Sequence, residues 1–408
     1  MNLHPEEDTT LNREQQAFFG QSRVSLKETE TLTYQERLEE VRTVRLAGDF
    51  SRALQLLNNL QTTVAPNQRS ADRISYLNEL SECLRCLGQY DEAIIWAQKA
   101  LQLAEETSDL LGQGYALNNL GAIHKRRGEL DQAEEFFLQS LAISRKLENL
   151  RQIATALTNL GELYRQRGEL TQAEKWCQQS LLIREQIGNP QELAVSRYQL
   201  MRIFLMRRRF ADAASQVGQL EQLAQTSKLE DVVARHHLAT GMLKFQQGDL
   251  RDALNLGWQA RSQAEQIPNF GLTIETTEFL VFCLLQLYLF AEENVHLTWC
   301  EALLKELERF SKRERLYGTY AESLLIQGLL KRATFDVKEA TGFFHRAEIL
   351  AGERGLQLIA QQARSELAKL QKQIDKLQQF QKMSPELYEQ IQVQEVLGYI
   401  QQVRTVVG

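Results

Sequence analysis

A repeat of 40 residues constrains the fold of this 408-residue chain more than any other feature of its sequence. Residues 119–133 align without a gap to residues 159–173, and both segments begin with Asn-Leu-Gly and contain Gly-Glu-Leu at the same distance. The same offset leads back to 88–93 and 48–53 and forward to 208–213 and 248–253. Such periodicity predicts an array of stacked units, because each unit buries its apolar face only against its neighbours.

Each unit is predicted to contain two antiparallel helices, here named helix A and helix B. Gln, Leu, Glu, Ala and Arg, which are good helix formers, are abundant, and the whole chain has only 5 prolines. A glycine at the end of helix A can adopt the left-handed conformation that closes a helix. The residue three positions later can cap helix B. These expected caps are Ser51, Asp91, Asp131 and Thr171.

Small residues recur at one phase in each helix. A glycine inside a helix costs about 1 kcal/mol of helix propensity, so its recurrence at a fixed phase indicates a packing reason. We expect these positions to let helix B approach helix A closely. They are Gly121, Gly161, Gly241 and Gly328 in helix A, and Ala93, Ala133, Ala173, Ala213 and Ala253 in helix B.

At these spacings the chain resembles the tetratricopeptide repeat (TPR) family. The residues that carry the resemblance in one unit are Leu120, Gly121, His124, Gly128, Ala133, Phe137 and Ser140. The period exceeds the common one of about 34 and resembles the longer repeats of kinesin light chains, LGN-type polarity adaptors and bacterial Rap-type peptide receptors. The resemblance is strong from about 35 to 255 and implies an all-α, right-handed α-solenoid of antiparallel helix pairs that holds a partner protein or peptide.

We expect four segments along the chain. Residues 1–32 form a flexible arm, 33–265 a regular array of about six units, 266–356 degenerate units, and 357–408 C-terminal helices. The small residues are lost near 288–293 and return at Gly328, after roughly seven extra residues that we place around 306–315. Ser384-Pro385 is predicted to open a last helix with an apolar stripe from Val393 to Val403. That helix either caps the array or covers its groove.

The resemblance implies that one stripe of each helix A lines a concave groove. The last position of this stripe is basic in four successive units, and asparagines occur at two positions near the middle of helix A. Cations and amides in this arrangement suit an extended acidic peptide. The predicted groove residues are Arg45, Asn78, Arg85, Asn118, Asn119, Lys125, Asn159, Arg165, Tyr198 and Arg202.

Two questions about this groove stay open in the sequence. Glu82 precedes Arg85 by three residues and Glu162 precedes Arg165 by three, so each pair can neutralise itself locally. Further along, the same stripe becomes apolar. Those side chains either grip an amphipathic partner helix or pack inward. The apolar positions are Tyr198, Leu205, Met242 and Phe245.

Overall charge and apolar patterning limit the classes of partner. The net charge of −6 lacks the basic excess of a nucleic-acid binder. The acidic start lacks an apolar signal segment, and the longest apolar stretch, 279–291, is too short to span a bilayer and is expected to be a buried core helix. An odd number of cysteines, 5, fits a reducing cytoplasm. We therefore expect a cytoplasmic protein that binds neither nucleic acid nor membrane.

Reaction centres and cofactor motifs are not apparent. The sequence has no P-loop, Gly-x-Ser-x-Gly or His-Glu-x-x-His pattern. Cys83 and Cys86 form a lone Cys-x-x-Cys, which is a weak zinc signal and better explained by burial. We predict no enzyme, no cofactor and no metal, and favour a scaffold or adaptor for a partner peptide or helix. A ligand-responsive regulatory receptor of Rap-like type is the alternative.

Overall fold

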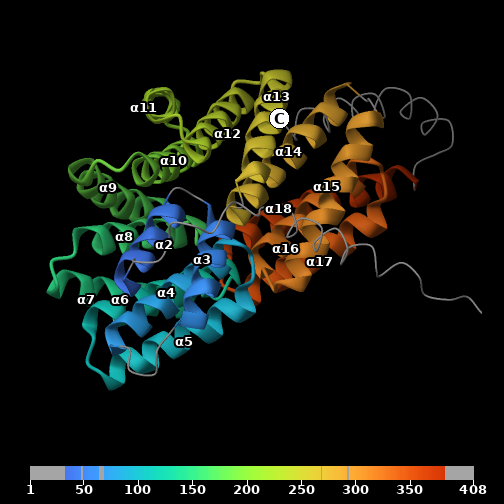
Figure 1. Cartoon of the computed structure of the whole chain (residues 1–408). Coiled ribbons are helices and arrows are strands. Elements are labelled where there is room, and N and C mark those ends of the chain that lie inside the picture. The colour runs from blue at the N-terminus through green and yellow to red at the C-terminus, as the bar shows by residue number, and fades with distance from the viewer. Residues whose placement is uncertain (1–32, 47–48, 64–68, 268, 292–293, 382–408) are drawn as a thin grey trace, which may run out of the picture.

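The computed structural model describes residues 33–46, 49–63, 69–267, 269–291 and 294–381. Within this part of the chain every regular element is a helix, which confirms the all-α solenoid (Figure 1). The predicted arm, 1–32, and the predicted last helix beginning at Pro385 lie outside the described residues.

Consecutive helices pair as A and B of one unit, and the described residues contain eight such pairs followed by the long helix α18 (Gln357–Gln381). Units 1 to 4 are α2 (Tyr34–Leu46) with α3 (Phe50–Thr63), α4 (Ser70–Cys86) with α5 (Tyr90–Glu106), α6 (Leu110–Arg126) with α7 (Leu130–Lys146), and α8 (Leu150–Gln166) with α9 (Leu170–Ile187). Units 5 to 8 are α10 (Pro190–Met206) with α11 (Phe210–Ser227), α12 (Glu230–Gln246) with α13 (Leu250–Gln266), α14 (Phe270–Ala291) with α15 (Asn294–Arg313), and α16 (Tyr317–Ala333) with α17 (Val337–Glu353).

The glycines inside helix A stand where the two helices of a unit cross. A Cβ added at Gly121 would lie 2.7 Å from the ring of Phe137, and one at Gly161 would lie 2.3 Å from the Sγ atom of Cys177. Real Cβ atoms do not approach other heavy atoms so closely. The packing reason predicted for these glycines is therefore confirmed.

The predicted caps of helix B are wrong. Helix α5 begins one residue before Asp91, and the N-cap residue Gln89 makes no side-chain capping hydrogen bond. Asp91 instead pairs with Arg127 of the next unit, and Asp131 pairs in the same way with Arg167 at 2.5 Å. In units 3 to 5 the side-chain caps belong to helix A, whereas the B helices α3 and α17 are capped by Asp49 and Asp336. The caps of these three A helices are Asp109, Asn149 and Asn189, which accept hydrogen bonds of 3.0, 3.1 and 3.0 Å from the backbone N–H three residues on.

The seventh unit departs from the others by helix length. Helix α14 has 22 residues and α15 has 20, whereas α6 and α8 have 17 each. The extra residues thus extend both helices of the unit and are not confined to 306–315. One helix segment, Phe270–Phe290, is long and apolar enough to cross a membrane by length and composition, but 67% of its most apolar window is buried inside the protein. That burial confirms the expected core helix.

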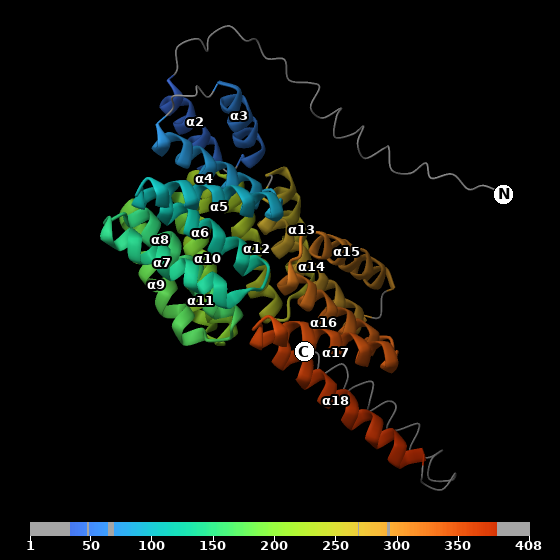
Figure 2. The same ribbon diagram turned by 90° about the horizontal axis from the view of Figure 1, so that it is seen from below.

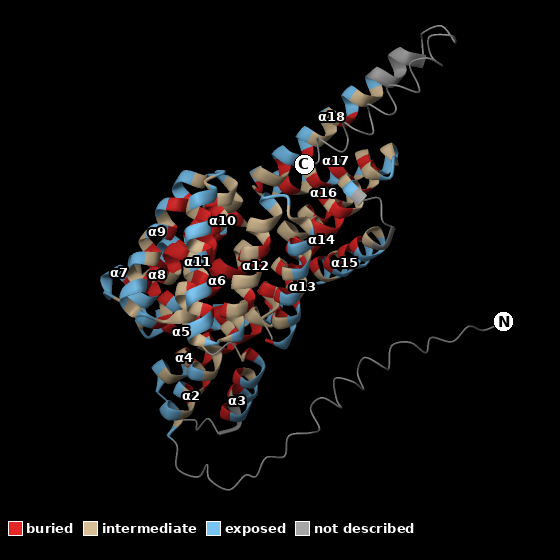
Figure 3. Cartoon of the chain, turned by 90° about the horizontal axis from the view of Figure 1, so that it is seen from above, coloured by how far each residue is buried: buried red, intermediate tan, exposed pale blue. Residues whose placement is uncertain are grey.

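The second half of the array returns to the first half after five units (Figure 2). The turn at Gly88 in unit 2 faces Phe270 and Phe310 of unit 7. One unit further on, the turn at Gly128 faces the start of α16. Two of the apolar clusters accordingly combine side chains from early and late units. Buried positions lie on the facing sides of the helices, and exposed ones follow the outside (Figure 3). The superhelix therefore encloses its concave face.

Candidate functional site

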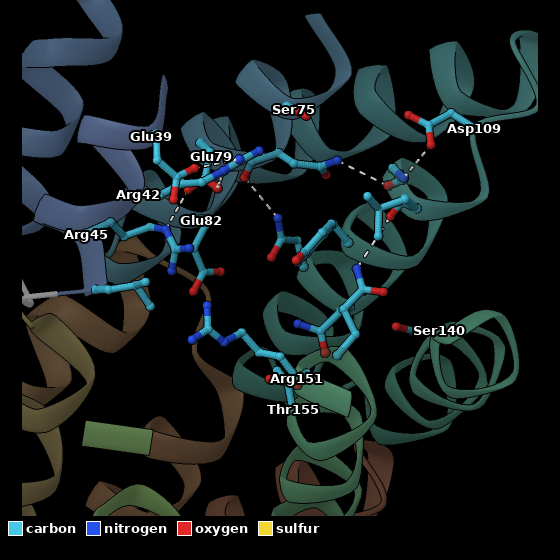
Figure 4. Close-up of a pocket in the computed structure, with 18 of the residues that line it drawn as sticks. Glu39, Arg42, Arg45, Ser75, Glu79, Glu82, Asp109, Ser140, Arg151 and Thr155 are labelled. Atoms are coloured by element: carbon cyan, nitrogen blue, oxygen red, sulfur yellow. Dashed lines mark hydrogen bonds and ion pairs between the residues drawn. The ribbon is translucent and has the colours of Figure 1, made fainter. Parts of the chain in front are cut away.

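Two adjoining cavities lie along the concave face. The first pocket, about 350 Å³, is lined by α2, α4, α6, α8 and the start of α10 (Figure 4). The second pocket, about 280 Å³, extends over the same A helices to α10, α12 and α14. Both pockets share Arg45, Leu46, Glu82 and Glu192, so they form one continuous groove.

Seven of the ten predicted groove residues line these pockets. Arg45 faces both pockets; Asn78, Asn118 and Asn119 line the first, and Arg85, Lys125 and Asn159 line the second.

The other three predicted residues do not line either pocket. Tyr198 is fully buried in the packing of α10 with α12, with its ring between Arg202 and Arg235, so its assignment to the groove surface is wrong. The neighbouring apolar positions Leu205, Met242 and Phe245 pack against the same cluster. Arg165 and Arg202 both contact the carboxylate of Glu162.

Most cations of the predicted ladder are already paired. Arg45 contacts Glu79 of the next unit at 2.5 Å. Arg85 contacts Glu82 at 2.7 Å, and Arg165 contacts Glu162 at 2.8 Å, both within their own helices. Local neutralisation, which the sequence left open, thus holds for these side chains. A partner gains little from a cation that is already satisfied by a carboxylate.

Lys125 is the exception in the ladder. Ala122 stands three residues before it, where Glu82 and Glu162 stand in the neighbouring units. The Lys125 Nζ atom donates to Asn159 Oδ1 at 3.1 Å, and no carboxylate of the described residues lies within ion-pair distance of it. Burial therefore lowers the pKa of Lys125 to about 7, although the nearby Glu162 favours the charged form.

The amide side chains tie neighbouring A helices together. Asn78 Nδ2 donates to the Gly112 carbonyl at 3.1 Å, and Asn119 Nδ2 donates to the Asn78 carbonyl at 3.1 Å. Asn159 Nδ2 donates to Asn118 Oδ1 at 3.0 Å. The Oδ1 atom of Asn78, by contrast, is buried and has no hydrogen-bond partner among the described residues. It belongs to a side chain that lines the first pocket.

Among the residues of the second pocket that sequence reasoning missed, three bear on its chemistry. Gln199 follows Asn119 and Asn159 at the same offset of 40, and its buried Oε1 atom has no partner in the described part of the chain. Arg235 occupies the stripe position of Ser75 and Thr155 four and two units earlier. Both follow from the same periodicity once residue types other than Asn are admitted. The third, Glu275, comes from the irregular helix α14 and has no such signal.

Glu275 joins the two halves of the array across the groove. Its carboxylate lies 3.4 Å from Arg126 of α6 and 3.9 Å from Arg202 of α10. These guanidinium groups hold the pKa of Glu275 below its usual value despite burial. The second pocket is therefore walled by both the early units and the seventh one.

Catalytic and metal chemistry gains no support from the described side chains. They contain no group of three or more His, Cys, Asp or Glu that could hold a metal ion. Cys83 is completely buried, as predicted, and burial raises its pKa well above the usual range, which makes it a poor nucleophile.

Helix pairs stacked with a fixed period, crossing at glycines, define an α-solenoid with a concave binding face. The tetratricopeptide-repeat family model matches residues 72–146 and 152–226, which span units 2 to 5. Units 2 to 5 are therefore tetratricopeptide repeats, a fold that generally serves protein interaction. No curated protein matches it in sequence.

Solved structures share the fold at low identity. The crystal structure of a Rap protein complexed with competence and sporulation factor matches with a TM-score of 0.55 and 13% identity, over 84% of this chain and 98% of that one. The Rap conjugation gene regulator of plasmid pLS20, in complex with the Phr* peptide, gives 0.55 and 12%, over 75% and 85%. The Cut9–Hcn1 hetero-tetramer of APC/C gives 0.51 and 12%, over 86% and 59%.

Proposed function

We propose that this protein binds a peptide, or a peptide-like segment of a partner protein, in the groove formed by the two pockets. The observation that carries the proposal is the continuous groove on the concave face, whose lining residues Asn78 and Gln199 each hold a buried amide oxygen without a hydrogen-bond partner among the described residues. Buried polar groups are normally hydrogen-bonded, and backbone N–H groups of a peptide would satisfy both.

The similar solved structures agree with this proposal. Two Rap-type chains of the same fold were crystallised with a factor or a peptide, as their descriptions state. At 12–13% identity they show the fold alone, so the occupant of this groove is inferred from its own side chains.

Filling the second pocket tests the proposal. Val195 lines this pocket without a polar role, so Val195→Trp should occupy the space of a ligand. We expect binding of peptides from a random six-residue library to fall at least about tenfold, because a ligand must displace the indole ring. Gln98→Trp on the exposed side of α5 is the matched control and should bind like the unmodified chain. Unchanged binding by a folded Val195→Trp variant would overturn the groove assignment.

A regulatory receptor is the second candidate function, and the position of Glu275 favours it. A ligand in the second pocket touches α14 of the second half together with α4 and α6 of the first. Its binding energy can therefore act on the relative placement of the two halves. Spin labels at exposed positions of α7 and α17 should report a changed distance on peptide binding. An unchanged distance would favour a passive scaffold.

A further inference from the structure

Two adjoining hollows lie on the outer face of units 6 and 7, where α15 follows the outside of the array (Figure 3). The first, about 290 Å³, lies between the B helices α13 and α15. The second, about 530 Å³, follows the last three turns of α15. Both hollows share Ala302 and Glu306, so they form one surface, here named the outer patch. No residue of the outer patch lines either pocket of the groove.

One end of the outer patch is aromatic. The rings of Trp258 and Trp299 meet edge to face, with centroids 5.8 Å apart, and Trp299 is 52% exposed. Beneath them the buried Arg261 contacts Glu265 at 2.7 Å and Glu306 at 2.9 Å, so these charges neutralise one another. The exposed indole face offers a surface on which another aromatic ring can pack. This end of the patch therefore favours an aromatic side chain.

The other end of the outer patch is basic. Lys305, Arg309 and Arg313 follow one another at intervals of four residues, so they lie on one face of α15. Lys305 and Arg309 are exposed and have no ion pair with any described residue. Arg313 contacts Glu314 at 2.8 Å but remains 71% exposed. This end of the patch therefore attracts carboxylates.

The sequence before α2 carries the complementary groups at a matching separation. Its first twelve residues contain the carboxylates of residues 6–8 and no Lys or Arg, and Phe18 follows Asp8 by ten residues. On α15, Trp299 precedes Arg309 by ten residues, which is about 15 Å along a helix. Ten residues of chain span this distance whether they are helical or partly extended.

We infer that residues 6–19 of this chain dock on the outer patch. The phenyl ring of Phe18 packs against Trp299, and the carboxylates of residues 6–8 lie beside Lys305 and Arg309. The patch is thus an interaction surface separate from the groove, and its occupant is a segment of the same chain.

The length of the connecting segment permits this docking. Fifteen residues join Phe19 to Tyr34, where α2 begins, and they can span up to about 50 Å. Tyr34 and Trp258 pack against one and the same apolar cluster, so the connection starts from the cluster that also carries the patch. Exposed ion pairs are individually weak. A tethered segment has an effective concentration on the order of millimolar, so weak contacts suffice to hold it.

Photo-cross-linking of the full chain tests the docking. The chain carries the change Phe18→p-benzoylphenylalanine and is irradiated in dilute solution after mixing with an isotopically labelled copy. Mass spectrometry should place the cross-links on α13 and α15 around Trp299 of the same molecule. Cross-links to a second copy, to the groove, or only to elements other than α13 and α15 would overturn the inference.

Charge reversal tests the basic end of the patch. The Lys305→Glu, Arg309→Glu double variant should lower the yield of this cross-link about fivefold or more, because two attractions become repulsions. Lys146→Glu with Lys175→Glu, two exposed cations on the B helices α7 and α9, is the matched control and should stay within about twofold. Reversing residues 6–8 to Lys in the first double variant should restore the yield. Equal losses in both double variants, or no restoration, would contradict the charge pairing.

Limited digestion with trypsin supplies a readout without the cross-linker. Arg13 lies between the carboxylates and Phe18, so docking should slow cleavage after it. Trp299→Ala removes an exposed side chain and should speed this cleavage about threefold or more. Leu182→Ala, which truncates a 63% exposed side chain on α9, is the matched control and should leave the rate unchanged. Equal rates in the two variants would contradict the packing of Phe18 against Trp299.

Discussion

Helices A and B pack against each other in different ways in the third and the seventh unit of the array. In unit 3, Gly121 leaves room for the ring of Phe137, so α6 and α7 cross closely. In unit 7 the corresponding position of helix A is Val281, and both helices are longer. The Phe279 side chain of α14 packs against unit 6, where Gly241 and Gly257 leave space for its ring.

This difference shows what the irregular unit contributes. The regular unit crosses closely at its own glycine, whereas α14 also places a ring in the unit before it and contacts the early units through Phe270 and Glu275. The regular units therefore supply the repeated side chains of the groove, and the irregular unit supplies the carboxylate that crosses it. Three changes should break or sharpen this contrast.

The largest effect is expected from Phe279→Ala. Phe279 is 6% exposed and packs edge-on against Phe245, so truncation should cost about 3–5 kcal/mol and loosen α14 from unit 6. Phe290→Ala on the same helix is the control, because that side chain is 53% exposed and should cost under about 0.5 kcal/mol. Urea denaturation measures both. Equal losses would show that unit 7 does not depend on the space left by the glycines of unit 6.

A smaller effect is expected from Gly121→Ala in unit 3. The new methyl group would meet the fully buried Phe137 ring, a clash costing about 1–3 kcal/mol that exceeds the gain in helix propensity of about 1 kcal/mol. Gly218→Ala in α11 has open space around its Cβ and should stabilise the chain by about 0.5–1 kcal/mol. Thermal unfolding of the two variants should shift in opposite directions. A stabilised Gly121→Ala would mean that the crossing is not close packed.

The third effect concerns Lys125 and depends on pH. Its folded-state pKa of about 7 lies below the ordinary value for lysine, so the unfolded chain binds more protons between about pH 7 and 10. Stability relative to Lys125→Met should therefore rise with pH across this window, by at most about 1.4 kcal/mol per pH unit. Below pH 7 the difference should be constant. Denaturation at pH 6, 7, 8 and 9 measures it, and parallel curves would contradict the burial of an unpaired lysine.

Much of the groove follows from the periodicity of the sequence. Residues at one helical phase and an offset of 40 must line the same face, and Arg45, Asn78 and Lys125 do line the pockets. Tyr198 obeys the same phase but lies where α10 and α12 close on each other, and no local pattern reveals that closure. Periodicity also does not distinguish a paired cation from an unpaired one, unless a neighbour such as Ala122 is read with it.

The sequence by itself determined the all-α repeat, its 40-residue period and the close crossing at Gly121 and Gly161, because these depend on contacts within one or two units. Only the tertiary structure decided that unit 7 meets units 2 and 3, and that Glu275 stands opposite Arg126. Those contacts depend on how small rotations between units accumulate over five repeats. Small differences at each interface add up along the array, and no single stretch of residues specifies their sum.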